Sequence, residues 1–172
     1  LLVDTFTGPT LAVHFIDVGQ GDGALIVTPG GKHILVDSGP GHGVGNLTRY
    51  LEALRVNALD LVINSHAHAD HITGISTVLE RVSAKMALDP GLVHPTKPYE
   101  DMISAFETRK VPMKIARKGR VITLEDGIVI TLLAPEDPLL KGTRSDLNAN
   151  SVVFRLDYGE ISFLFTGDAE EG

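Results

Sequence analysis

The chain has 172 residues, of which 43% are hydrophobic and 22% are charged, and its formal net charge is −7. These proportions exclude a disordered chain, and the length is sufficient for one domain with a hydrophobic core. The absence of cysteine excludes disulfides and thiolate metal sites. The negative net charge argues against non-specific binding along nucleic acid, but bound divalent cations would offset negative charge at their own site.

The first third of the chain is rich in β-branched and apolar runs separated by tight turns, as in a series of strands. The residues "PGG" at 29–31 predict a hairpin. Leu47, Tyr50, Leu51 and Leu54 recur at helical spacing. The predicted strands cover 11–18, 24–28, 33–37 and 59–64, with a helix over 45–56 between the last two.

The rest of the chain alternates two amphipathic helices with further strands. The predicted helices cover 72–82 and 98–110, and the predicted strands cover 84–89, 111–118, 120–124, 128–134, 151–158 and 161–166. This order predicts a layered α/β domain with mixed sheets. Asp168 and Glu171 resemble the acidic first turn of a helix. Because a domain does not finish one turn into a helix, we expect the chain to be truncated at its C-terminus.

The segment "SHAHADH", residues 65–71, carries the strongest chemical signal. In an extended segment His66 and His68 point to one side, Asp70 continues that side, and the turn into the next helix brings His71 from another direction. Imidazole and carboxylate ligands suit Zn²⁺, Mn²⁺ or Fe²⁺. Four such residues exceed what one tetrahedral ion can use while keeping a position for water. The spacing therefore predicts two ions, one on His66 and His68 and one on Asp70 and His71.

Two further aspartates follow predicted strands. Asp168, in "FTGDAE", could bridge the two ions, although "TGD" alone is a common turn. Asp37, in "ILVDSG", could accept a hydrogen bond from a ligating histidine and so orient it, or could form a turn or a helix cap. The alternative for the cluster itself is a polar loop whose histidines cap the next helix.

Several segments together resemble a known family. "HAHADH" matches the H-x-H-x-D-H motif of the metallo-β-lactamase superfamily, while "VGQGD", "NANS" and "FLFTGDAEE" resemble the hydrolase domain of ComEC-type competence proteins and their free-standing relatives. The resemblance covers nearly the whole chain. It implies a single domain over 1–172, incomplete at its end, with an αββα sandwich and metals at one edge of the sheets. It also implies which residues are metal ligands: His66, His68, Asp70, His71 and Asp168.

The chain departs from the family pattern in two places. The resemblance implies a last histidine well after "GDAEE" and a third histidine on the first metal, and neither is found. "DLNANS" occupies the second place, so Asn148 or Asn150 is a candidate weak ligand or substrate contact, while His94 is interpreted mainly as a loop residue. The resemblance also places Asp22, in the "GQGD" turn, near the metals if that turn faces the same edge.

These observations predict a binuclear hydrolase that uses two divalent ions, Zn²⁺ or Mn²⁺. By the resemblance, its substrate is a phosphodiester, namely DNA taken up in natural competence, and Asp70 orients or deprotonates the nucleophile. The predicted partners are nucleic acid and, in a larger parent protein, membrane-spanning parts. Only if the chain is part of a competence protein do we expect a soluble domain that is membrane-associated and extracytoplasmic.

Two alternatives remain open. One is a hydrolase of the same fold that acts on phosphorylcholine esters, thioesters or lactams, and the other is a non-catalytic metal-binding or DNA-binding module. Six basic residues over 109–120 either form a phosphate-contacting stripe or protect an exposed edge strand from aggregation.

Overall fold

The computed structural model describes residues 10–124 and 127–170. The described helices are α1 (Val44–Ala53), α2 (Ala69–Ile72), α3 (Ile75–Arg81), α4 (Lys97–Thr108) and α5 (Asp146–Ala149). The described strands are β1 (Ala12–Phe15), β2 (Ala24–Val27), β3 (His33–Val36), β4 (Ala58–Leu59), β5 (Leu61–Ile63), β6 (Ser83–Ala84), β7 (Ala87–Asp89), β8 (Met113–Ile115), β9 (Val121–Thr123), β10 (Ile128–Ala134), β11 (Val153–Tyr158) and β12 (Ile161–Phe165).

The strands form two main sheets of different character. The first has the order β1-β2-β3-β5-β7-β8, antiparallel from β1 to β3 and parallel from β3 to β8. The second is an antiparallel sheet with the order β12-β11-β10-β9, and β4 pairs with β6 in a short parallel ladder. The domain is therefore α/β with mixed sheets, as predicted.

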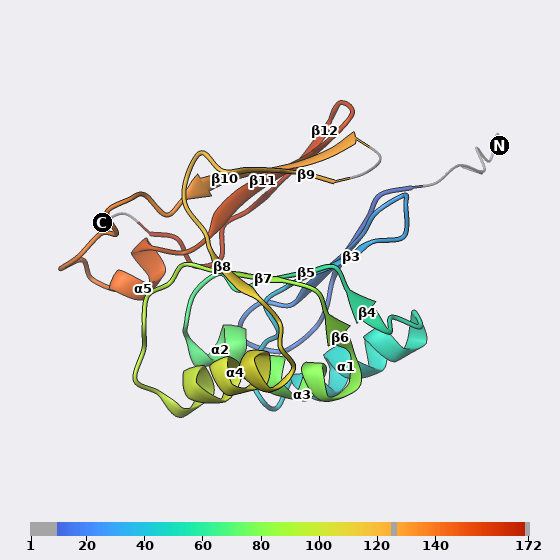
Figure 1. Cartoon of the computed structure of the whole chain (residues 1–172), viewed down its shortest axis with the longest axis horizontal. Helices are drawn as coiled ribbons and strands as arrows, with labels where there is room; N and C mark the ends of the chain where they lie inside the picture. Colours follow the sequence, from blue (N-terminus) through green and yellow to red (C-terminus); the bar gives the residue numbers. More distant parts are fainter. Residues whose placement is uncertain (1–9, 125–126, 171–172) are drawn as a thin grey trace.

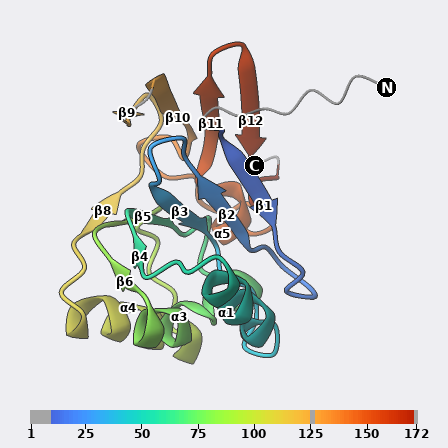
Figure 2. The same ribbon diagram turned by 90° about the vertical axis from the view of Figure 1, so that its right-hand side faces the viewer.

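Successive side chains along the strands of the first sheet point to opposite faces, so the domain has one hydrophobic core on each face of this sheet. Leu35 and Val62 face the helices and pack with Leu51, whereas Ile34 and Ile63 face the second sheet. Figures 1 and 2 show α1, α3 and α4 on one side of the first sheet and the strands β9–β12 on the other. The described residues thus supply three of the four layers of the predicted αββα sandwich.

The predicted elements agree with the described ones except for their ends and four details. The strand predicted over 59–64 is divided, because Leu59 belongs to β4 and only Leu61–Ile63 form β5. The helix predicted over 72–82 is divided into α2 and α3 at Gly74, where a Cβ would lie 2.4 Å from the carbonyl oxygen of Ser38. The strand predicted over 84–89 extends only over β7, because the start of that segment belongs to the β4–β6 ladder. The one-turn helix α5 was not predicted.

The basic stretch 109–120 lies along β8, an edge strand of the first sheet. Arg117 and Arg120 donate to backbone carbonyl groups, and Lys118 pairs with Glu136. Contacts within the protein therefore occupy several of these cations, in line with the edge-strand interpretation.

Over residues 10–124 and 127–170, no helix is long and apolar enough to cross a membrane. Asp168 lies in a turn after β12, and Glu171, the second residue of the predicted helix start, lies outside the described residues.

Candidate metal centre

The first candidate ion position lies where β5 ends. His66 and His68 follow this strand, and His66 Nε2 lies 2.9 Å from His68 Nδ1. Asp168, after β12, places Oδ2 3.9 Å from His66 Nε2. One ligand atom of each residue lies within 4.8 Å of those of the other two. Two imidazoles and one carboxylate fit Zn²⁺ or Mn²⁺ and leave a coordination position for water.

The second candidate position shares Asp168 with the first. The other oxygen of that carboxylate, Oδ1, lies 3.4 Å from His71 Nε2. Asp22, from the turn before β2, completes a second group whose ligand atoms lie within 4.8 Å of one another. Asp168 therefore presents one oxygen to each group and could serve both positions.

Asp37 fixes the orientation of His71 from beneath the site. Its Oδ1 accepts a hydrogen bond from the backbone N–H of Ser65 at 2.7 Å, and its Oδ2 accepts one from the Ser65 hydroxyl at 2.6 Å. The same Oδ2 lies 2.9 Å from His71 Nδ1. Because Nδ1 is held by this carboxylate, Nε2 of His71 faces Asp168, as expected for a histidine oriented toward an ion.

A glycine allows the end of β12 to reach the site. Gly167 has a φ of 49°, and a Cβ at this position would lie 2.6 Å from the Cβ of Ser65. A larger residue would push the chain away from the end of β5 and carry Asp168 with it. The sequence "TGD" therefore serves both the turn and the placement of the carboxylate.

The electrostatics of the site distinguish its two buried histidines. Burial, together with the neighbouring His71 and His68, lowers the pKa of His66 to about 3, so this imidazole is neutral at physiological pH. Burial also lowers the pKa of His71, but Asp37, Asp168 and Asp22 outweigh it and raise the pKa to about 9. The same carboxylates that favour a proton on His71 also favour a metal cation, which would take the place of that proton at Nε2.

Burial raises the pKa of Asp37, although His71 and Ser65 oppose the increase through their hydrogen bonds. Asp37 is completely buried and His71 is nearly so. The pair is therefore enclosed, away from solvent.

Asp70 lies outside both groups of ligand atoms. Its Oδ2 accepts a hydrogen bond from Gln20 Nε2 at 3.2 Å. Burial opposes ionisation of Asp70, but its own backbone N–H, His71 and Gln20 outweigh that effect and lower the pKa below the ordinary value. Asp70 is therefore an ionised carboxylate beside the site, and its predicted role as a ligand stays a prediction.

The asparagines of "DLNANS" also lie outside both groups. Asn150 is buried, and its side chain bonds to the backbone of Leu140 and Asp146, so it holds the loop before β11. Asn148 Oδ1 is buried and has no hydrogen-bond partner in the described part of the chain. His94 lies in a loop, as predicted, and its ring centroid is 6.4 Å from that of His68.

Sequence reasoning missed Ser65 and Gln20. Ser65 bonds to Asp37 and lies 3.0 Å from His66 Nδ1, and Gln20 holds Asp70. The signal for Ser65 was its place between a buried strand and the first histidine. Gln20 had no signal of its own, because only the fold brings its turn against α2.

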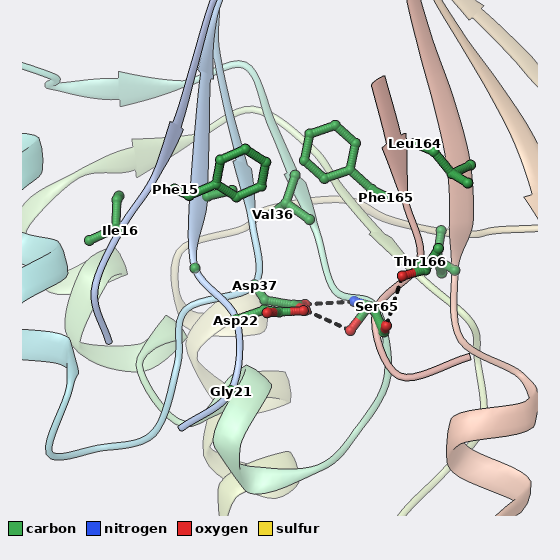
Figure 3. A pocket seen from close by; sticks show the side chains of 14 residues that line it. Phe15, Ile16, Gly21, Asp22, Val36, Asp37, Ser65, Leu164, Phe165 and Thr166 are labelled. Carbon is green, nitrogen blue, oxygen red and sulfur yellow. Dashed lines mark hydrogen bonds between the residues drawn. The ribbon is translucent and has the colours of Figure 1, made fainter. Parts of the chain in front are cut away.

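A cavity of about 280 Å³ opens beside the centre, between the edge strands β1 and β12. Figure 3 shows Phe15 and Phe165 at its apolar end and Asp22, Asp37 and Ser65 at its polar end. Phe15 is 75% exposed and stacks against Phe165 with ring centroids 6.2 Å apart. The cavity thus joins an exposed apolar surface to the carboxylates of the centre.

Comparison with known proteins places this geometry in context. The sequence profile of the Metallo-beta-lactamase superfamily matches residues 16–172. ComE operon protein 3 of Bacillus subtilis is 27% identical over 92% of this chain, and Recombination protein 2 of Haemophilus influenzae is 33% identical over 99%. The chain spans only 22% and 20% of the length of these relatives. These matches confirm the resemblance predicted from the sequence motifs.

A solved metallo-beta-lactamase structure from Cronobacter sakazakii superposes with a TM-score of 0.61 at 18% sequence identity. The match covers 94% of this chain and 62% of that chain. At this identity the similarity establishes the fold alone.

Proposed function

Because the chain belongs to the metallo-β-lactamase superfamily, we propose that it is a binuclear metal-dependent phosphodiesterase that acts on DNA. The observation that carries the proposal is the pair of ligand groups that share Asp168. Members of this superfamily are metal-dependent hydrolases, and two adjacent divalent ions are well suited to displacement at phosphorus.

The donor set fits two ions of borderline hardness. Histidine nitrogens and carboxylate oxygens converge, His66 is neutral and able to donate a lone pair, and the chain has no cysteine to favour softer ions. His66, His68 and Asp168 would hold one ion, and His71 with Asp168 would hold the other. When bound, the two ions supply Lewis-acid polarisation of the phosphate and lower the pKa of a nearby water molecule.

The residues around the ions have separate tasks in this mechanism. Asp70, ionised and fixed by Gln20, orients the attacking water and accepts its proton. Asp37 holds His71 in one orientation through Nδ1. Asp168, after β12, would be shared by the two positions.

DNA as the substrate rests on the relatives. Recombination protein 2 of Haemophilus influenzae, 33% identical over nearly the whole chain, is named for a process that acts on DNA. The net charge of −7 does not oppose an anionic substrate, because two divalent ions add four positive charges at the site itself.

The direct test is cleavage of single-stranded and double-stranded DNA after addition of Mn²⁺ or Zn²⁺. We expect metal-dependent cleavage by the native protein and at least about a thousandfold loss with His68→Ala, since that histidine would be a ligand of the first ion. His14→Ala is the control, because His14 contacts Tyr50 and belongs to neither ligand group, so this variant should leave the rate unchanged.

A folded, metal-loaded protein that leaves both DNA forms intact would remove DNA from the proposal. Turnover of chromogenic phosphorylcholine esters, thioesters or lactams would then identify another hydrolase of the same fold. Loaded protein without turnover on any of these would indicate a binding module.

A further inference from the structure

Four cations gather where the first sheet ends at β8. Lys114 lies in β8, and Arg117, Lys118 and Arg120 follow it before β9. The stretch 109–120 contains no acidic residue, although the whole chain has a net charge of −7. Three of the four side chains are exposed, and that of Arg117 is half-buried. We call these four residues the basic patch.

Contacts within the protein hold the two arginines of the basic patch without neutralising them. Arg117 Nη1 donates to the carbonyl oxygen of Pro90 at 2.7 Å, and Arg120 Nη1 donates to that of Ile115 at 3.0 Å. A carbonyl group carries no formal charge, and a guanidinium has five N–H donors. Each arginine therefore keeps its positive charge and has further donors to offer.

Most of the charge of the basic patch is uncompensated. Among residues 10–124 and 127–170, Lys118 alone of the four pairs with a carboxylate, that of Glu136. Three positive charges remain, which makes the patch complementary to a polyanion. Protection of the edge strand β8 is compatible with this role, because both depend on charge that stays exposed.

The basic patch lies at the same end of the first sheet as the candidate metal centre. β5, β7 and β8 are parallel neighbours, and Figure 1 shows β8 beside β7, so their carboxyl ends lie together. The centre follows β5 and Arg117 follows β8, two strands away, or about 10 Å at the usual strand spacing. Nucleotides of one DNA strand are about 3.4 Å apart along the helix axis, so about three of them cover this distance.

The loop between β7 and α4 connects the two regions. Its first residue, Pro90, accepts the hydrogen bond from Arg117. His94, in the same loop, has its ring centroid 6.4 Å from that of His68. One short loop thus contacts the basic patch at one end and a predicted metal ligand at the other.

From this arrangement, and resting on the DNA substrate of the proposed function, we propose that the basic patch binds phosphate groups of DNA beside the segment held at the centre. Lys114 and Arg120, both exposed, contact the phosphates, and Arg117 adds its charge from its position against Pro90. Contacts to phosphate carry no direct preference for base sequence. The patch therefore adds affinity for DNA without taking part in the chemical step.

The first test measures binding without cleavage. A fluorescent, nuclease-resistant phosphorothioate duplex is titrated with the manganese-loaded protein at several salt concentrations, and affinity is measured by fluorescence anisotropy. The double variant Lys114→Gln/Arg120→Gln should bind at least about tenfold more weakly at low salt. The slope of log affinity against log salt should fall by about 0.9 for each lost contact. Lys114→Gln alone, which breaks no hydrogen bond or ion pair of the described residues, should show the loss of one contact.

The double variant Arg81→Gln/Arg155→Gln is the matched control, because it also removes two positive charges from exposed side chains. Arg81 pairs with Glu52 in the helical layer, and Arg155 pairs with Asp157 in the second sheet. Distant exposed charges are screened by salt, so this variant should bind the duplex within about twofold of the native affinity.

A second test separates binding by the basic patch from the chemical step. Values of kcat/KM are measured for DNA and for bis(p-nitrophenyl) phosphate, a phosphodiester too small to span both regions. In Lys114→Gln/Arg120→Gln, the ratio of the DNA value to the small-substrate value should fall at least about tenfold.

Native affinity and a native salt slope in Lys114→Gln/Arg120→Gln, with its fold verified by circular dichroism, would overturn the proposal. A native protein that fails to bind the duplex at low salt would overturn it as well. Cleavage of DNA with an unchanged ratio in this variant would leave the proposed function in place and exclude the basic patch. Binding that depends on Lys114 and Arg120 without any cleavage would support the patch and count against the proposed function.

Discussion

A fully buried carboxylate, Asp37, lies between the end of β5 and the histidine of α2. It accepts two hydrogen bonds from Ser65 and holds His71 through Nδ1. It follows β3 in the left-handed region, with a φ of 54°, which an aspartate tolerates better than most residues. At the scale of single residues, Asp37 therefore sets the direction of one predicted ligand.

We expect Asp37→Asn to weaken metal binding by about ten- to a hundredfold, because an amide cannot accept from Ser65 and from His71 with both of its terminal atoms. Zinc titration by calorimetry measures the change. Asp89→Asn is the control, since it makes the same substitution at another buried position that touches no predicted ligand. Equal zinc affinities for the native protein and Asp37→Asn would show that Asp37 has only a packing role.

The buried carboxylate of Asp89 makes the stability of the protein depend on pH. Burial raises its pKa, although the backbone N–H of Gly91 and the amide of Asn64 oppose the increase. Above pH 3.8 an unfolded Asp89 has released its proton while the folded one still holds it. The free energy of unfolding should therefore fall as pH rises from 3.8 to the folded pKa.

Asp89→Asn removes this penalty and should raise the free energy of unfolding at pH 7 by about 1 kcal/mol. Urea unfolding at pH 4 and pH 7 measures the effect, which should be larger at pH 7. A variant less stable than the native protein at pH 7 would mean that the ionised carboxylate contributes more through Gly91 than burial takes away.

At the scale of elements, two glycine turns allow the cost of backbone strain to be distinguished from the cost of a steric clash. Both glycines have a positive φ, but only one lies against another segment of the chain. Gly21 and Gly31 have φ angles of 92° and 79°, yet a Cβ at Gly31 would meet nothing within 4 Å. Gly31→Ala should lower the free energy of unfolding by about 1–2 kcal/mol through backbone strain alone. Gly21→Ala should lower it further and also weaken zinc binding, because the turn must move away from Asp70.

Chemical denaturation and zinc titration of the two variants check this difference. If Gly21→Ala binds zinc as tightly as Gly31→Ala, the turn at 19–22 does not contribute to the centre.

The spacing of apolar residues along the sequence predicted most helices and strands, because the residues that this spacing places on one face are the ones buried in the fold. The run 128–134 is β10 residue for residue, and the hairpin at 29–31 is closed by bonds between Thr28 and Lys32. The break between α2 and α3 escaped prediction because it depends on the contact of Gly74 with Ser38, far away in the sequence. The helix α5 escaped because one turn has no periodicity to detect.

The same distinction applies to the candidate centre. His66, His68 and His71 were predicted because they lie together in the chain. Asp168 was predicted from its place after a strand, and its Oδ1 lies 3.4 Å from His71 Nε2. The position of Asp22 near the centre was suggested only by the family resemblance. Nothing in the sequence of the turn between β1 and β2 indicates that it contacts α2.

At the scale of the whole molecule, the first sheet separates two cores and brings distant segments to one edge. Asp22, Asp37, His66 and Asp168 come from the ends of different strands or from the turns between them, and they meet where both cores end. Each core fixes a different part of the centre. The helical side holds α2 with His71, and the core between the sheets holds β12, which leads to Asp168.

The most direct measurement is anomalous scattering at the zinc absorption edge from crystals of the zinc-loaded protein. We predict two peaks per chain about 3.5–4 Å apart, one beside His66 and His68 and one beside His71, with Asp168 between them. A single peak, or two peaks of which either lies away from Asp168, would contradict the two-ion centre.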